Sequence, residues 1–159
     1  MELRLYSFVN FYLSSIQQGV QTGHAAVDLV MKYTADSDHG NTVRDWASNH
    51  KTFIILNGGN MASLQERATI VQNSGLPYVT FSEDEQSLGG IMTTVAVVVP
   101  ENIFSAVPVD NMGGFDLGNY YYQTPVGRES EFAAVDTYFP VGHKYHGFIE
   151  MLRKSRLAS

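Results

Sequence analysis

The segment Thr93–Val99 (TTVAVVV) constrains the fold more than any other part of the chain. Its residues are apolar or β-branched almost without a break, and they are too few to span a membrane. A strand with one face in water would alternate polar and apolar residues, whereas this run offers both faces to a core. The sequence therefore predicts a central strand with side chains packed on both sides of a sheet.

Other segments predict the helices and strands around that strand. The ranges 3–9, 51–56 and 78–81 resemble strands, and helical spacing of apolar residues runs from Ser15 to Lys32 and from Met61 to Asn73. Ser15 with Gln18 fits a capping box, Asn60 fits an N-cap, and Gly75 with Pro77 fits a helix end. We expect a loop over Thr34–Asn41 and a short helix over Thr42–Ser48. The order predicts an α/β fold, with a small mixed β-sheet of about four strands flanked by helices.

The chain changes character after Pro100. Residues 101–143 contain three of the five prolines, five glycines and many Tyr and Phe residues, and a helix is expected near Tyr145–Leu157. We therefore divide the chain into an α/β domain over 1–100 and a loop-rich aromatic C-terminal extension over 101–159, packed on the same domain.

Composition narrows the classes of function. The 159 residues contain no cysteine, which excludes disulfides, a cysteine nucleophile and thiolate metal sites. No apolar run reaches the length of a membrane helix, and the N-terminus lacks the pattern of a signal peptide, so we expect a cytoplasmic protein. The formal net charge is −6, which argues against the basic surface typical of nucleic-acid binding.

One helix carries the residues most able to do chemistry. Gln17, Gln21, His24 and Asp28 are spaced as one polar stripe along the first helix. A histidine one turn after a glutamine can move a proton while the amide orients a carbonyl or water. Spacing alone also allows a solvated helix face with no function.

This stripe lies within a resemblance to a known family. The pattern Q-x-x-H-A-A-V at Gln21–Val27 resembles the signature helix of type 2 peptidyl-tRNA hydrolases. The tryptophan at position 46, the strand KTFIIL, the Ser-Gly-Leu-Pro turn and the segment 87–100 also resemble that family. The resemblance covers residues 4–100 and implies a small mixed α/β fold that cleaves the ester between a peptide and tRNA, without metal or cofactor.

Matching positions imply roles for particular residues. Gln21 and His24 match the family's helix glutamine and histidine, and Thr94 matches the threonine that opens its last strand. A family lysine is replaced by Gln17, and an aspartate near the end of the first strand by Asn10; both are candidates for substrate binding. In an alignment without gaps, Ser82 stands at the position of the family's catalytic aspartate. The acidic candidates Glu83, Asp84 and Glu85 follow it directly.

Two hypotheses for function follow from these matches. In the first, the chain is a divergent peptidyl-tRNA hydrolase, with peptidyl-tRNA as substrate despite the acidic charge. In the second, the fold is a non-catalytic binding or assembly module, and the aromatic extension around Tyr121 forms a homo-oligomer interface.

Two further features have simple structural explanations as well as functional ones. The turn Asn57–Asn60 (NGGN) could hold an anion, or it could be only a connection from strand to helix. Asp36, Asp38 and His39 could bind a metal, but turn-forming aspartates in a polar loop also account for them.

Overall fold

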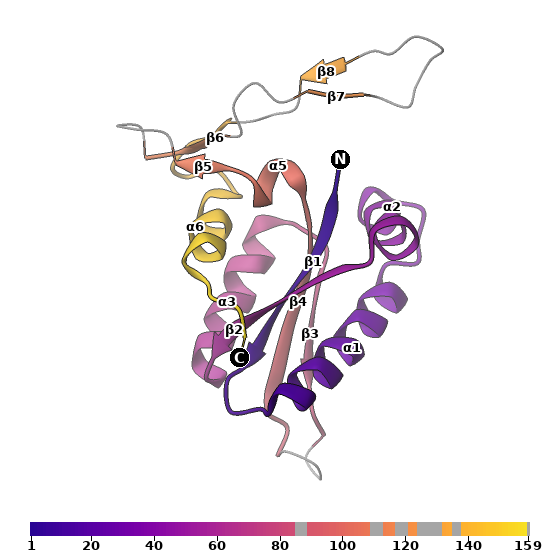
Figure 1. Cartoon of the computed structure of the whole chain (residues 1–159), viewed down its shortest axis with the longest axis vertical. Coiled ribbons are helices and arrows are strands. Elements are labelled where there is room, and N and C mark those ends of the chain that lie inside the picture. The colour runs from indigo at the N-terminus through magenta and orange to yellow at the C-terminus, as the bar shows by residue number, and fades with distance from the viewer. Residues whose placement is uncertain (85–88, 109–112, 117–120, 124–131, 135–137, 159) are drawn as a thin grey trace.

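The chain folds around a four-stranded mixed sheet with helices on both faces, as the sequence predicts (Figure 1). The computed structural model describes residues 1–84, 89–108, 113–116, 121–123, 132–134 and 138–158. The strands of the sheet are β1 (Leu3–Asn10), β2 (Thr52–Gly59), β3 (Tyr78–Ser82) and β4 (Met92–Pro100). Their order is β2-β1-β4-β3, in which β1 is parallel to β2 and antiparallel to β4, and β3 is antiparallel to β4.

Two layers of helices cover the sheet. On one face lie α1 (Ser15–Lys32), α2 (Asp38–Asp45) and the π-helical turn η1 (Trp46–His50), and on the other lie α3 (Met61–Ser74) and α6 (His146–Lys154) (Figure 1). Alternate residues of β1 and β4 divide between the two layers, because successive side chains of a strand point to opposite faces. Ala96 and Val98 pack toward α1, while Val95, Val97 and Val99 pack toward α3 and α6.

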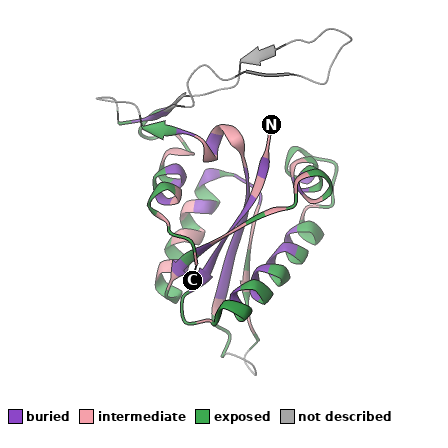
Figure 2. Cartoon of the chain, viewed as in Figure 1, coloured by how far each residue is buried: buried purple, intermediate pink, exposed green. Residues whose placement is uncertain are grey.

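The prediction for the central strand is confirmed. Residues Thr93–Val99 of β4 are all buried, and β1 on its flank is almost as inaccessible (Figure 2). The outward faces of the helices are exposed. The hydrophobic core is therefore built on both sides of β1 and β4.

The caps of α3 agree with the prediction, and the cap of α1 differs from it. Asn60 caps α3 by accepting a hydrogen bond from the Ser63 amide, and Gly75 ends it with a φ of 73°, as predicted. The predicted capping box of Ser15 and Gln18 is wrong: Ser14 and Gln17 form it. The sequence offers two adjacent Ser-x-x-Gln registers, and burial of Gln18 against the domain leaves only the first available at the exposed helix end.

Around α2 the predicted boundaries were also inaccurate. The helix starts at Asp38 because the Ser37 hydroxyl caps it by accepting a hydrogen bond from the Gly40 amide, so the predicted loop is shorter. Strand β2 continues to Gly59 because Asn57 and Gly59 still pair with β1.

The two glycines inside α1 do not meet another element. A Cβ at Gly19 or Gly23 would have no atom within 4 Å outside the helix, so no close approach of another backbone requires glycine at either position. Gly58 shows the opposite situation, because a Cβ there would lie 2.5 Å from Leu64 Cδ2 and 2.8 Å from the Val9 carbonyl oxygen. Only glycine fits at that position.

Part of the C-terminal extension shares the core of the domain. Phe148, Ile149 and Met151 of α6 are buried in the same cluster as Leu64 and Val71 of α3. The extension also contains α5 (Glu101–Phe104) and the short strands β5 (Val107–Pro108), β6 (Phe115–Asp116), β7 (Tyr121–Gln123), β8 (Phe132–Ala134) and β9 (Tyr138–Phe139). Tyr120 lies outside the described residues.

The chain after α6 runs along the outer edge of β2. The Asn57 amide donates to the Arg156 carbonyl at 2.9 Å, and the Ala158 amide donates to the Ile55 carbonyl at 3.0 Å. Leu157 forms an antiparallel bridge with Leu56. This pairing ends the predicted C-terminal helix at Lys154, three residues early.

Candidate functional site

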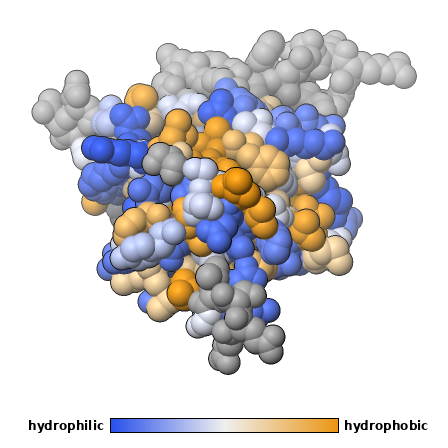
Figure 3. Space-filling view, turned by 60° about the horizontal axis from the view of Figure 1, so that its bottom comes forward, coloured by the Kyte–Doolittle hydropathy of each residue, from blue (hydrophilic) through white to orange (hydrophobic). Residues whose placement is uncertain are grey.

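The candidate residues gather at one end of the sheet. Strand β1 ends at Asn10, α1 begins at Ser15, and β3 and β4 meet across the turn that follows Ser82. All three lie at the bottom of Figure 1, away from the short strands β5 and β6 of the extension. Figure 3 shows this end of the molecule, where hydrophobic and hydrophilic side chains lie side by side.

Gln21 is the centre of the polar contacts at this end. Its side-chain amide donates from Nε2 to Glu83 Oε2 at 2.6 Å, and its Oε1 accepts from Thr93 Oγ1 at 3.0 Å. Gln21 is buried, with 6% of its surface exposed, so the hypothesis of a solvated helix face is wrong for this residue. A buried amide with both ends bonded is fixed in orientation, and it fixes the carboxylate that it contacts.

Sequence reasoning did not identify Thr93. It is buried, and its hydroxyl lies within hydrogen-bonding distance of both Gln21 Oε1 and the Phe81 carbonyl, the latter at 3.3 Å. Phe81 pairs with Thr94 and Ser82 pairs with Met92, so Thr93 is the extra residue of a β-bulge. The bulge brings Thr93 to Gln21, and nothing in the sequence pattern indicated it.

Thr94, the residue matched to the family, lies one step further inside. It is fully buried, and its hydroxyl donates to Thr93 Oγ1 at 3.4 Å. Hydrogen bonds therefore connect Thr94, Thr93, Gln21 and Glu83 in series, from the interior of the sheet to a partly exposed carboxylate.

Of the two acidic candidates that the structure describes, Glu83 has a hydrogen bond with Gln21. The Glu83 amide donates to the Ile91 carbonyl at 3.1 Å, which holds it where β3 turns toward β4. Asp84 is exposed, and its carbonyl accepts from the Gly90 amide at 3.3 Å. Glu85 lies outside the described residues.

His24 lies one turn after Gln21 on the exposed side of α1. Its ring meets the Phe81 ring edge to face, with 5.1 Å between centroids. A shallow pocket beside it is lined by Gly23, His24, Val27, Asp28 and Phe81. Residues three apart on a helix have Cβ atoms about 5–6 Å from each other, so the side chains of His24 and Gln21 are neighbours on the surface of α1.

Gln17 and Asn10 both serve the connection between β1 and α1. Gln17 is exposed, and its Oε1 accepts from the Ser14 amide in the capping box. Asn10 is buried, accepts from the Tyr12 amide at 3.1 Å and donates to the Met92 carbonyl at 3.5 Å. Asn10 therefore ties this connection to the start of β4, beside Thr93.

The chain places no cation near Gln21 in sequence. Between Arg4 and Lys32 there is no Lys or Arg, so β1 beyond Arg4, the connection and α1 up to Met31 carry no positive side chain apart from His24 when protonated. The acidic run Glu83–Glu85 adds negative charge. The charges near Gln21 in sequence therefore do not attract phosphate.

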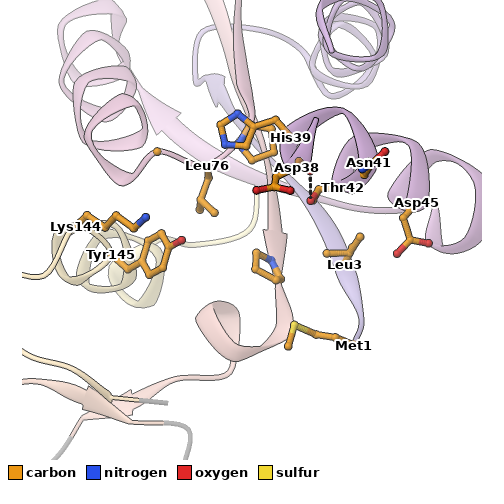
Figure 4. A pocket seen from close by; sticks show the side chains of 13 residues that line it. Met1, Leu3, Asp38, His39, Asn41, Thr42, Asp45, Leu76, Lys144 and Tyr145 are labelled. Carbon is orange, nitrogen blue, oxygen red and sulfur yellow. Dashed lines mark hydrogen bonds between the residues drawn. The ribbon is translucent and has the colours of Figure 1, made fainter. Parts of the chain in front are cut away.

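A large cavity lies elsewhere, at the opposite end of β1 and β4. It has a volume of about 710 Å³, and its lining includes Asp38, His39 and Asp45 on one side and Lys144 and Tyr145 on the other (Figure 4). None of the residues proposed above for catalysis or substrate binding lines it. Asp36, proposed above with Asp38 and His39 as a metal ligand, instead lies 3.8 Å from Arg44 in an ion pair.

The described part of the chain contains no group of three or more His, Asp or Glu side chains placed to hold a metal ion. It also has no helix with the length and apolar character needed to cross a bilayer.

Comparison with known proteins agrees with the geometry. The family model of peptidyl-tRNA hydrolase PTH2 matches residues 14–107, which is more than half of the chain. The match includes α1, β2, α3, β3 and β4, and so contains Gln21, His24, Glu83, Thr93 and Thr94. No curated protein matches the chain. The chain belongs to the PTH2 family of peptidyl-tRNA hydrolases.

Proposed function

We propose that this chain hydrolyses the ester that joins a peptidyl or N-blocked aminoacyl group to tRNA. The observation that carries the proposal is the bond from Gln21 to Glu83, supported by Thr93, on the helix that matches the family. It gives the chain an oriented carboxylate one residue after Ser82, which matches the position of the family's aspartate in ungapped register.

Glu83 is the proposed general base. Gln21 holds Oε2, and Oε1 can accept a proton from a water molecule. The oxygen of that water attacks the ester carbonyl carbon and gives a tetrahedral intermediate. When the intermediate collapses, the bond to the ribose oxygen breaks, and the proton returns to that oxygen to release the tRNA hydroxyl.

The remaining predicted residues have supporting roles in this proposal. His24 carries a proton between Glu83 and the leaving oxygen, and Thr94 supports Thr93 from the interior. Gln17 and Asn10 define the edge of the site where α1 begins.

Release of tRNA from N-acetyl-aminoacyl-tRNA tests the proposal. Loss of a general base reduces turnover by about 10²–10⁴-fold, so Glu83→Gln should lower kcat by at least about a hundredfold. Glu66→Gln, which removes an exposed carboxylate from α3, is the matched control and should retain full activity. Absence of turnover by the native chain, at enzyme concentrations equal to the substrate, would reject the proposal in favour of the non-catalytic module.

The oligomer prediction is separate from this chemistry. The side chain of Tyr121 lies outside the described part, and the interface remains a prediction. Light scattering of the native chain and of Tyr121→Ser tests it, because an interface there requires a mass above 17.6 kDa that falls with the substitution.

A further inference from the structure

A small groove at the end of β2 gathers positive charge in this acidic chain. Its volume is about 220 Å³, and Arg67 of α3, Lys154 of α6 and Arg156 of the C-terminal segment line it together with Asn57, Gly59 and Ser155. Three of the ten Lys and Arg residues therefore meet in one place. Two of the three lie outside the range that matches the family.

The groove retains an excess of positive charge. Lys154 pairs with Glu150 at 2.7 Å, whereas neither Arg67 nor Arg156 forms an ion pair within the described residues. Arg67 is partly buried, lies over the Phe8 ring and donates to the Gly58 carbonyl at 3.2 Å. Burial lowers the pKa of Arg67, so this guanidinium has lost part of its hydration and gains from a bound anion.

The backbone brings these cations together. The Arg156 carbonyl accepts from the Asn57 amide at 2.9 Å, which seats the C-terminal segment beside the turn that begins α3. Guanidinium groups bind phosphate through two parallel hydrogen bonds, and an ammonium adds a point charge. A groove of this size and composition suits a single phosphate group.

The groove lies at the same end of the sheet as Glu83. The Gly59 carbonyl accepts from the Phe11 amide at 3.0 Å, and Asn10, which pairs with Gly59, donates to the Met92 carbonyl at the start of β4. Strands β2 and β3 are the two outer strands of the sheet, so the end of β2 and Glu83, which follows β3, are about 15 Å apart, or three strand spacings. A short single-stranded segment can span that distance.

Two aromatic side chains lie between the groove and the carboxylate. Phe11 and Tyr12 are 45% and 78% exposed, and their ring centroids are 4.1 Å apart. Their place in the β1–α1 connection puts them between Gly59 and the start of α1. Exposed aromatic rings beside a cationic groove are the combination that binds single-stranded nucleic acid.

We propose that this groove binds a backbone phosphate of the single-stranded RNA that carries the ester, and that Tyr12 stacks a base of the same segment. The inference rests on the proposed function for its substrate, and three of its contact residues, Tyr12, Lys154 and Arg156, lie outside the range that matches the family. It also explains how a chain of net charge −6 can bind RNA, because a local cluster of cations can bind a phosphate without a basic surface over the whole molecule.

Binding of a short RNA tests the proposal without turnover. The probe is the oligoribonucleotide ACCA with a 5′-fluorescein, measured by fluorescence anisotropy over a range of salt concentrations. Arg156→Gln should weaken binding about fivefold at low salt and reduce the salt slope by about 0.7, the value for one phosphate contact on a single strand. Lys144→Gln, which removes one exposed charge before α6, is the matched control and should change neither value.

Substitutions at Tyr12 test the stacking contact. Tyr12→Ser should weaken ACCA binding about tenfold, and Tyr12→Phe, which keeps the ring, should restore it. Because the side chain is 78% exposed, neither change should affect folding.

The outcomes separate this inference from the proposed hydrolysis. If Arg156→Gln binds ACCA with the same affinity and salt slope as the native chain, the proposed phosphate site is rejected. The same holds if Lys144→Gln loses as much affinity as Arg156→Gln. Either result rejects the site even when the native chain cleaves N-acetyl-aminoacyl-tRNA. Sensitivity of ACCA binding to Arg156 in a chain without turnover supports the groove and rejects the hydrolysis.

Discussion

The two ends of the central sheet differ in how they hold polar groups. At the end where β4 begins, Thr94, Thr93, Gln21 and Glu83 form a connected series of hydrogen bonds. At the other end, polar side chains such as Asp38 and Lys144 line a cavity of about 710 Å³. The larger hollow lacks the connected polar network, so volume is a poor guide to the site in this molecule, and orientation of a carboxylate is a better one.

Among substitutions at the two ends of the sheet, we expect Thr93→Val to have the largest effect on activity. The substitution removes the donor to Gln21 Oε1, which leaves a buried acceptor unsatisfied and lets the amide turn away from Glu83. We expect kcat for N-acetyl-aminoacyl-tRNA to fall about a hundredfold, and the free energy of unfolding to fall by about 1–3 kcal/mol. Thr80→Val, at an exposed position of β3, is the control for loss of a hydroxyl. Full activity of Thr93→Val would show that the series of hydrogen bonds has no role in catalysis.

His24→Ala should have a smaller effect at the same end. A proton shuttle contributes about 10²-fold, and water can replace part of this at an exposed position, so we expect a loss of about tenfold in kcat. His24 is exposed and contacts Phe81 only at a ring edge, so the melting temperature should change little. A lower melting temperature with unchanged kcat would assign His24 a structural role instead.

Gly19→Ala and Gly23→Ala test whether the outer side of α1 is open. A Cβ meets nothing at either position, and alanine is preferred over glycine inside a helix by about 1 kcal/mol. Each variant should therefore gain about 1 kcal/mol in chemical denaturation. If Gly23→Ala lowers kcat/KM while Gly19→Ala does not, the substrate backbone passes closely over Gly23, next to His24.

Asp38→Asn should have the smallest effect. It changes the charge of the large cavity and leaves the hydrogen bonds of Gln21 intact. We expect kcat and KM to stay within about twofold of the native values, because Asp38 lies at the opposite end of the sheet from Glu83. A change in kcat beyond tenfold would mean that the two ends are coupled.

Local signals predicted most of the fold. Uninterrupted β-branched residues identified β4, and Asn60 and Gly75 set the ends of α3, because each depends on neighbouring residues alone. The resemblance on α1 predicted the family and led to Gln21 and Glu83. Only the structure shows that Glu83 contacts Gln21.

The details of the site depend on contacts between distant segments. The bulge at Thr93 arises from pairing of β3 with β4, and Gln21 is buried by strands that lie far away in sequence. The groove brings together Arg67 and Arg156, which are more than half the length of the chain apart in sequence. Periodicity and motif spacing carry no information on such contacts.

The pairing of the C-terminal segment with β2 also bears on how the chain behaves at high concentration. A strand at the edge of a sheet offers unpaired amides and carbonyls to any other extended chain, which is a route to aggregation. Residues 156–158 occupy those groups at Ile55 and Asn57 with the chain's own backbone. The same few residues that hold Arg156 in its groove therefore act as a built-in cover against intermolecular strand addition.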